Sequence, residues 1–335
     1  MRRAIADAEV GDEQRGEDPS TRALEEWAAE LLGHEAAIFV PTATMANQIA
    51  LKVLSEPADE VVAEADAHVF RSELGGPAFH SGLAMKRIAG CRGLFSPEQV
   101  RDAVNPGEMH LAPTRLLCLE NTHNGGGGKV WPLELVREVC AEARRHGLAV
   151  HLDGARLMNA AVASGVPAAD YGREFDTVTL CLSKGLGCPL GAVLAGSTEH
   201  MAKARRYKHL FGGAMRQSGI AAAAGVYALE HHVDRLAEDH ANARLLATGL
   251  AEAGLPADPE ETETNFVLLD AGALGLTAPE AAALLAEQGL LMSAAIRRGC
   301  LRAVTHLDVS ADDVARAIEA ASKALAGRPA AAATA

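Results

Sequence analysis

The sequence predicts an α/β fold with one large doubly wound domain followed by a small α+β domain. Between residues 36 and 233, short runs rich in β-branched residues alternate with helical patterns, which is typical of a mainly parallel sheet covered by helices. Near residue 235 the pattern changes to one long helix and a shorter mixed segment. The length of 335 residues also suits about two domains.

The predicted domain boundaries follow from these changes of pattern. We place an amino-terminal arm and the large domain in residues 1–235 and the small carboxy-terminal domain in residues 236–326. The stretch 327–335 is a low-complexity, alanine-rich run, so we expect a flexible tail there.

Helix-start signals and strand-like runs place the elements of the large domain in order. Asp18 followed by Pro19 predicts the first long helix, and Ser96 with Pro97 and Gln99 predicts another that begins with a capping box. The expected strands are 36–40, 60–70 with its exit, 115–123, 148–153, 175–183 and 191–196. The other expected helices are 48–54, 132–147, 154–165, 200–210 and 219–233.

The small domain is predicted to begin with a long helix at 234–254. Its shorter elements are expected at 264–270, 279–290, 291–296 and 300–306. A last helix is expected from Ser310.

The composition indicates a soluble protein of the cytoplasm. The formal charge of −13 argues against nucleic acid as a partner, because a net acidic surface repels phosphates. The six cysteines are scattered and form no CxxC pair, which indicates reduced thiols rather than disulfides or a zinc site, so we expect no metal. Residues 1–20 lack the apolar core of a signal peptide, and no uncharged run is long enough to span a bilayer, so we expect no membrane contact.

Polar residues follow four of the expected strands, at the edge where ligands bind in open parallel sheets. Asp153 comes after LAVHL and Lys184 after TVTLCLS. The segment 42–44 follows AAIFVP and opens a helix, and His123 follows RLLCLEN. Structural explanations exist for each: Asp153 would cap a helix, and Lys184 would lay its stem over the sheet edge. The segment 42–44 would be a plain helix start, and His123 a hydrogen-bonded loop residue. That all four lie at one edge of one sheet by chance is much less expected than any one of these explanations taken singly.

Together these residues suit one cofactor, pyridoxal 5′-phosphate. A lysine at position 184, partly shielded by Leu182, Leu186 and Leu190, has its ammonium form disfavoured, and its amine then forms a Schiff base with an aldehyde. A carboxylate such as Asp153 holds a pyridine nitrogen protonated, which makes the ring an electron sink. Backbone amides and a hydroxyl at a helix start suit the phosphate.

Two further roles complete such a site. A ring must lie over the pyridine face, and His68 is a candidate. An arginine must bind the substrate carboxylate with both of its nitrogens, and either Arg156 or Arg302 is suitable. The strongest signal is the pair HLDGAR and LSKGLG in this order and spacing.

At ENTHN, HLDGAR, CLSKGLGCPLGAVL and GGAMRQSG the chain resembles the low-specificity L-threonine aldolases, within the β-eliminating lyase group. The stretches GEDPS, FVPTATMANQ, EADAHVF and LRAVTHLDVS continue the resemblance over nearly the whole chain. It implies an aspartate-aminotransferase-like fold (fold type I of the pyridoxal phosphate enzymes). In that fold the large domain has a mainly parallel seven-stranded sheet, and the carboxy-terminal α+β domain is small.

The resemblance also implies how the cofactor is held. Lys184 would form the Schiff base, and Asp153 would face the pyridine nitrogen. His68 would stack on the ring. Thr44 and the amide of Ala43 would hold the phosphate.

The roles implied for the substrate and for the assembly involve four other residues. Arg156 and Arg302 would bind the substrate carboxylate, and His123 would lie near the β-hydroxyl group. Arg216 would reach the phosphate bound by a neighbouring subunit. The resemblance implies a homotetramer whose active sites are shared across a dimer interface.

The chain departs from the family pattern at several points. The sequence as given begins downstream of the Arg-Ser-Asp-Thr segment whose serine helps to bind the carboxylate in the family, so either the true start lies further upstream or carboxylate binding is weakened. Ala43 stands where glycine is usual, and its Cβ would hinder a backbone that needs positive φ. Arg15 replaces a tyrosine near the substrate entrance, and the glycine-rich run 124–128 suggests a looser loop.

The implied activity is retro-aldol cleavage of L-threonine, L-allo-threonine and related L-β-hydroxy-α-amino acids to glycine and an aldehyde. His123 is the first candidate for the base that accepts the β-hydroxyl proton, and His68 is the second. The alternatives are another pyridoxal phosphate-dependent β-eliminating lyase, or a catalytically impaired homologue that lacks the amino-terminal binding segment. A dehydrogenase is disfavoured because no GxGxxG follows the first strand.

Overall fold

The computed structural model describes residues 1–294 and 299–325, which divide into two compact units. The first unit consists of Met1–Thr122 and Trp131–Asp234. The second consists of His123–Val130 and the described residues from Arg235 onward. The expected tail at 327–335 lies outside the described residues, and the expected domain boundaries remain predictions.

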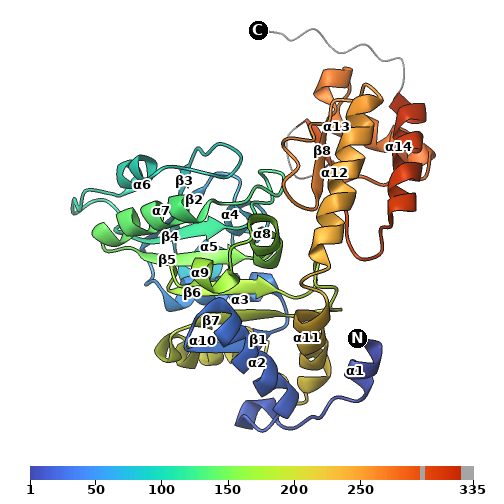
Figure 1. Ribbon diagram of the computed structural model, residues 1–335. Helices are drawn as coiled ribbons and strands as arrows, with labels where there is room; N and C mark the ends of the chain where they lie inside the picture. Colours follow the sequence, from blue (N-terminus) through green and yellow to red (C-terminus); the bar gives the residue numbers. More distant parts are fainter. Residues whose placement is uncertain (295–298, 326–335) are drawn as a thin grey trace. The chain divides into compact units, whose positions relative to one another are not determined.

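The first unit is built on a seven-stranded, mainly parallel sheet (Figure 1), as the predicted α/β architecture requires. The strand order is β1-β7-β6-β5-β4-β2-β3. Strand β7 runs in the direction opposite to that of the other six strands. The strands are β1 (Ala36–Val40), β2 (Glu60–Glu64), β3 (Ala84–Ile88), β4 (Thr114–Glu120), β5 (Ala149–Gly154), β6 (Thr177–Cys181) and β7 (Ala192–Gly196). Every residue of β6 and β7 is buried, as expected for strands covered on both faces.

The helices of the first unit begin largely where local signals predict. Asp18 caps α2 by accepting a hydrogen bond from the Thr21 amide at 2.9 Å, and Ser96 forms the expected capping box at α6. The predicted start of a helix at residue 48 is wrong, because Thr42 already caps α3. The helices are α1 (Arg2–Ala6), η1 (Glu13–Arg15), α2 (Pro19–Leu32), α3 (Ala43–Val53), α4 (His68–Arg71), α5 (Gly76–Ser81), α6 (Pro97–Ala103), α7 (Leu133–Arg145), α8 (Leu157–Ser164), α9 (Ala168–Gly172), α10 (Thr198–Leu210) and α11 (Gly219–His231).

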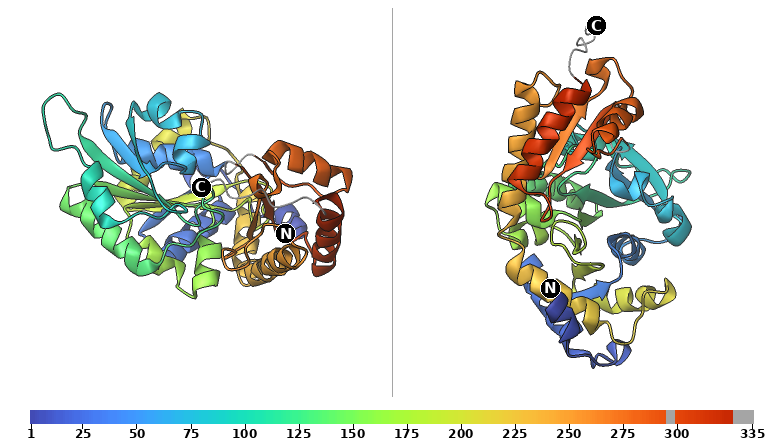
Figure 2. Two further views of the ribbon diagram at one scale, coloured as in Figure 1. Left: turned by 90° about the horizontal axis from the view of Figure 1, so that it is seen from above. Right: turned by 90° about the vertical axis from the view of Figure 1, so that its right-hand side faces the viewer.

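Apolar side chains bind these helices to the sheet. Helices α3 and α10 pack against β1 and β7 around Ile38, Val40, Ile49, Leu194 and Met201. Figure 2 shows helices on both faces of the sheet. The carboxyl ends of the parallel strands remain as the edge at which polar side chains gather.

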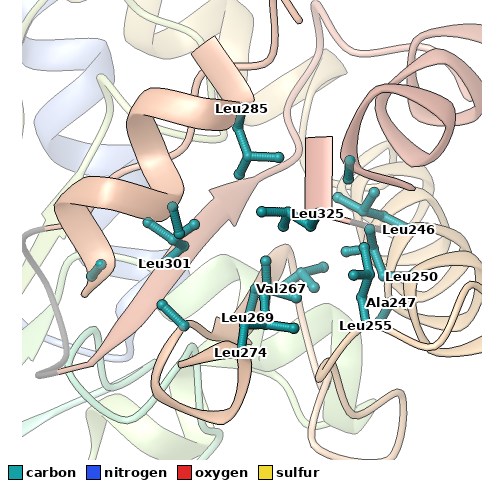
Figure 3. Close-up of a cluster of buried hydrophobic side chains, with 14 of the residues drawn as sticks. Leu246, Ala247, Leu250, Leu255, Val267, Leu269, Leu274, Leu285, Leu301 and Leu325 are labelled. Carbon is teal, nitrogen blue, oxygen red and sulfur yellow. The ribbon is translucent and has the colours of Figure 1, made fainter. Parts of the chain in front are cut away.

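The second unit is a two-stranded antiparallel sheet packed against helices. Its elements are α12 (Leu236–Glu252), β8 (Phe266–Asp270), η2 (Gly272–Leu274), α13 (Ala278–Glu287), β9 (Cys300–Val304) and α14 (Ala311–Leu325). A buried cluster that includes Leu250, Val267, Leu285 and Leu301 forms its core (Figure 3). Of the element expected at 291–296, residues 291–294 contribute one bridge, from Ser293, and the remainder lies outside the described residues.

No helix in the described ranges is both long enough and apolar enough to cross a bilayer.

Candidate active site

Four parallel strands bring the candidate residues of the first unit to one edge of the sheet. Strands β1, β2, β5 and β6 run in the same direction, so their carboxyl ends meet there. Asp153 is the next-to-last residue of β5, and Lys184 follows the end of β6. Ala43 and Thr44 follow β1, and His68 follows β2. Asp153, Lys184 and residues 42–44 therefore follow or end strands at one edge of the sheet, as the strand-end reasoning predicts, whereas His123, its fourth residue, belongs to the second unit.

Asp153 is a buried carboxylate with a specific set of donors. Its Oδ2 accepts from Asn47 Nδ2 at 2.8 Å, and its Oδ1 accepts from the Ala155 amide at 3.1 Å. The cap position of α8 belongs to Arg156, so Asp153 is not the cap of that helix. Within the described residues Asp153 has no ion pair within 4 Å, although it is only 2% exposed. Two hydrogen bonds thus stabilise this buried carboxylate, and a cationic group placed against it would stabilise it further.

His68 lies beside Asp153 and is held by a second buried acid. Its Nδ1 is 2.8 Å from Glu73 Oε1, and its amide donates to Glu120 Oε2 at 2.7 Å. The hydrogen bond to Glu73 is the main reason why the pKa of His68 is raised, and burial opposes this effect. One ligand-type atom each from His68, Glu73 and Asp153 lies within 4.8 Å of the other two.

An imidazole and two carboxylates at this spacing could bind a divalent metal, but their ligand atoms already take part in hydrogen bonds with each other and with Asn47. His68 Nδ1 is bonded to Glu73 Oε1, and Asn47 directs its amide hydrogens at both carboxylates. The expectation of no metal therefore remains a prediction that this hydrogen-bond pattern favours.

The start of α3 offers unpaired amides. Thr42 caps the helix by accepting from the Met45 amide at 3.1 Å. The amides of Ala43 and Thr44 have no acceptor among the described residues, as is usual in the first turn of a helix. Ala43 is not among the residues with positive φ, so its Cβ imposes no strain. This end of α3 suits a phosphate.

Lys184 lies in the turn between β6 and β7. Its carbonyl accepts from the Gly187 amide at 2.8 Å, and its partly exposed amine has no partner among the described residues. Leu182 and Leu186 are buried as expected. Leu190 is 42% exposed, and the expectation that it also shields the lysine remains a prediction.

Two arginines of the first unit were predicted to bind substrate or cofactor, Arg156 and Arg216, and their surroundings differ. Arg156 starts α8, three residues after Asp153, and is partly buried. Arg216 is exposed in the loop between α10 and α11, and its Nη1 is 2.7 Å from Asp12 Oδ2. Arg15, which is 73% exposed, lies 3.8 Å from the same Oδ2 atom.

His123 and Arg302 both belong to the second unit. His123 is buried, and its Nδ1 accepts a hydrogen bond from the Gly126 amide at 3.0 Å. Arg302 donates from Nη1 to Asn124 Oδ1 at 2.5 Å and lies over the ring of Phe266, 4.6 Å from its centroid. Burial lowers the pKa of Arg302. Loop 123–130 and strand β9 thus bring these two candidates into one cluster.

The glycine-rich loop is packed rather than loose. Gly127 and Gly128 both have positive φ, and a Cβ on Gly127 would come within 2.7 Å of Leu268. A Cβ on Gly128 would come within 2.6 Å of the Thr264 hydroxyl, which donates to the Gly128 carbonyl. The glycines therefore allow the loop that carries His123 to approach β8 closely.

Asn47, Glu73 and His151 are site residues that the sequence reasoning missed. His151 is fully buried in β5, and its Nε2 is 3.2 Å from Asn47 Oδ1. Asn47 precedes Gln48, where the sequence pattern placed the start of the helix. The signal that could have found His151 is its spacing: it lies two residues before Asp153, so both side chains point to the same face of the strand.

Comparison with known proteins supports a single family. The family model described as beta-eliminating lyase matches residues 1–272. The low specificity L-threonine aldolase of Escherichia coli K12 is 42% identical over 317 residues, which cover 94% of this chain and 92% of that protein. Low-specificity L-threonine aldolase 1 of Arabidopsis thaliana is 38% identical over 322 residues, 94% of this chain and 89% of that protein.

A solved structure shares the fold. The crystal structure of a putative L-allo-threonine aldolase from Listeria monocytogenes superposes with a TM-score of 0.78 at 20% identity, over 97% of this chain and 94% of that one. The expected fold type I architecture is thereby confirmed.

Proposed function

Because the chain belongs to the β-eliminating lyase family, we propose that it is a pyridoxal phosphate-dependent aldolase. Its reaction is the cleavage of L-threonine, L-allo-threonine and related L-β-hydroxy-α-amino acids to glycine and an aldehyde. The observation that carries this proposal is the placement of Asp153 near the carboxyl end of β5 and of Lys184 three residues after the carboxyl end of the adjacent parallel strand β6.

The described residues fit pyridoxal phosphate at three points. Asp153 is a buried carboxylate without a cation, which suits a protonated ring nitrogen. The open amides of Ala43 and Thr44 suit the phosphate, and the unpartnered Lys184 amine suits the aldehyde. When bound, the cofactor supplies an electron sink for the pair left on the α-carbon. His68 would lie over its ring.

Side chains of the protein orient the substrate and so select which of its bonds is cleaved. Arg156 and Arg302 would bind the carboxylate, which sets the bond between the α- and β-carbons in position for cleavage. Arg302 has a buried Nε with no partner among the described residues, so its guanidinium retains a donor for an anion.

The hydrogen bonds of the two histidines suggest opposite roles. His123 Nδ1 accepts from the Gly126 amide, so the proton of its neutral ring is on Nε2. Nε2 would then donate to the β-hydroxyl oxygen and orient it. His68 bonds through Nδ1 to the Glu73 carboxylate, so its neutral ring has a free electron pair on Nε2. His68 is therefore the better candidate for the base that takes the hydroxyl proton, and the order of the two sequence candidates is reversed.

The assembly proposed is a homotetramer whose active sites are shared across a dimer interface, with Arg216 reaching a neighbour's phosphate. Large apolar side chains on the surface of the first unit support it. Leu74, Phe79 and Leu210 are 102%, 85% and 73% exposed. Ring contact between His80 of α5 and Phe211, which follows Leu210, joins the two segments that carry them. A cytoplasmic location is proposed because the six cysteines are free.

The test is to incubate the purified protein with pyridoxal phosphate and L-allo-threonine. We expect equal amounts of glycine and acetaldehyde, and none from Lys184→Ala. 2-Oxobutanoate with ammonia would instead indicate β-elimination of the same substrate. A protein that binds the cofactor but releases no product would be a catalytically impaired homologue, and either outcome rejects the aldolase.

A further inference from the structure

Asn47 lies at the centre of a buried hydrogen-bond network that joins two carboxylates of the site. Its Nδ2 donates to Asp153 Oδ2 at 2.8 Å and to Glu73 Oε1 at 2.8 Å. Because an amide nitrogen has two hydrogens, these bonds use both of them. Asn47, Asp153 and Glu73 are 1%, 2% and 5% exposed. Water therefore has little access to replace either bond.

The direction of donation through this network is determined by its acceptors. Asn47 Oδ1 can only accept, so His151 Nε2, 3.2 Å away, carries the ring proton. His151 Nδ1 lies 2.9 Å from the Thr177 hydroxyl and 3.2 Å from the Thr177 carbonyl oxygen, and in this tautomer it accepts from the hydroxyl and makes no bond to the carbonyl. Burial lowers the pKa of His151 to about 4, so its ring is neutral and has a single proton near pH 7. Donation thus runs from Thr177 through His151 and Asn47 to the two acids.

The amide of Asn47 separates two like charges. The carboxylate oxygens of Glu73 and Asp153 lie within 4.8 Å of each other, where two negative charges repel strongly in a buried site. Each Asn47 N–H group points its partially positive hydrogen at one of those oxygens and so reduces their repulsion. Asn47 also belongs to α3, whose first residues are Ala43 and Thr44.

We propose that Asn47 is a positioning residue that holds Asp153 for the ring nitrogen of the cofactor and Glu73 for His68 at the same time. This inference rests on the proposed function. Helix α3 then contributes to three points of cofactor binding: the phosphate directly, the ring nitrogen through Asp153, and the ring face through Glu73. Removing the Asn47 amide would weaken the hydrogen bond between Asp153 and the protonated ring nitrogen. Asn47 itself need not touch the cofactor.

Gln48 provides a matched control on the same helix. Its Nε2 donates to Glu73 Oε2 at 2.5 Å, and within the described residues it makes no hydrogen bond to Asp153. Gln48 is also buried, at 2% exposure. Truncating Gln48 therefore disturbs the same packing and the same glutamate, and leaves the hydrogen bonds of Asp153 in place.

The experiment compares the wild-type protein with Asn47→Ala, Asn47→Ser and Gln48→Ala. Each is loaded with pyridoxal phosphate labelled with ¹⁵N in the ring. The readouts are the ¹⁵N chemical shift of the ring nitrogen, which reports its protonation, and the cofactor Kd from absorbance titration. In Asn47→Ala we expect the shift to move toward the unprotonated value and the Kd to rise about tenfold, as for the loss of one hydrogen bond to a charged group. In Gln48→Ala we expect the ring-nitrogen shift of the wild type.

Each outcome distinguishes the inference from the proposed function. If the wild type takes up no cofactor, both fail. If the wild type takes it up but both Asn47 variants keep its ring-nitrogen shift, or Gln48→Ala changes that shift equally, only the inference fails. Should circular dichroism show that Asn47→Ala is unfolded, Asn47→Ser, which retains one donor, is judged by the same criteria.

Discussion

Replacing Lys208 by methionine tests the buried ion pair that ties the amino-terminal arm to helix α10. Lys208 Nζ lies 2.7 Å from Glu13 Oε1, and the side chains are 1% and 7% exposed. Glu13 Oε2 accepts from the Met215 amide at 3.3 Å, and the Glu13 amide donates to the Arg216 carbonyl at 2.8 Å. The pair therefore anchors the base of the loop that carries Arg216.

The expected cost follows from the separation and burial of the charges. At this distance the direct attraction is about 6 kcal/mol for an effective dielectric constant of about 20. Loss of one partner from a buried pair typically costs about 3–5 kcal/mol, because the remaining charge stays desolvated. Here Arg205 Nη1, 3.9 Å from Glu13 Oε1, compensates the remaining carboxylate only in part. For a domain of roughly 150–250 residues each kcal/mol lowers Tm by about 2–4 °C, so Lys208→Met should lower it by roughly 6–20 °C.

The assay is thermal unfolding followed by circular dichroism, with two controls. Lys203→Met removes an exposed pair with Glu199 on the same helix and should leave the unfolding midpoint nearly unchanged. Glu13→Gln combined with Lys208→Met should be more stable than Lys208→Met alone, because it removes the buried carboxylate that only the more distant Arg205 would still compensate. Equal midpoints for the Lys203 and Lys208 variants, or no recovery in the double variant, would refute the reasoning.

Three further outcomes are expected. The pKa of His68 is raised chiefly by Glu73, so the stability from this pair is complete below the unfolded histidine pKa of about 6.5 and is lost as pH rises through the folded pKa. The difference in Tm between wild type and Glu73→Gln should accordingly be larger near pH 6 than near pH 9, and a constant difference would contradict this. Gly128→Ala should destabilise the second unit by about 2–3 kcal/mol in urea unfolding, because φ is +78° and its Cβ would meet a threonine hydroxyl, whereas Gly254→Ala, with φ +76° but open space, should cost about 1–2 kcal/mol. Arg302→Lys should raise KM for L-allo-threonine about tenfold without changing the cofactor Kd, because lysine lacks the bidentate fork; a matching loss of cofactor would place the arginine elsewhere.

Local chemistry made several features predictable from the sequence. The capping box at Ser96 involves residues three positions apart, so the pattern contains all of it. Asp153 and Lys184 were identifiable because they end buried strands, and parallel strands bring such positions to one edge. Ala43 could be named for the same reason, although the start of its helix was placed too late.

The rest depends on pairs that are distant in the sequence. Asn47 and Asp153 are 106 residues apart, and Asn47 and Glu73 are 26 apart, so no local periodicity reports their contact. Strand β3 was missed because it is an edge strand whose first residues are exposed, and it lacks the apolar run that identifies buried strands. The order that we propose for the His123 and His68 candidates rests on the hydrogen bonds of each ring nitrogen, which residue type alone does not specify.

The membership of loop 123–130 in the second unit has a consequence for protein engineering. Val130 donates its amide to Glu263 Oε2 at 2.9 Å, and Thr264 donates to Gly128, so the carboxy-terminal unit is completed by an upstream strip of chain. A gene fragment that starts at codon 235 would encode an incomplete module with an uncovered strand. Chimeras that exchange the second unit between homologues therefore need both segments, 123–130 and the chain from residue 235, from the same parent. A single crossover would combine loop 123–130 of one parent with the strands of the other.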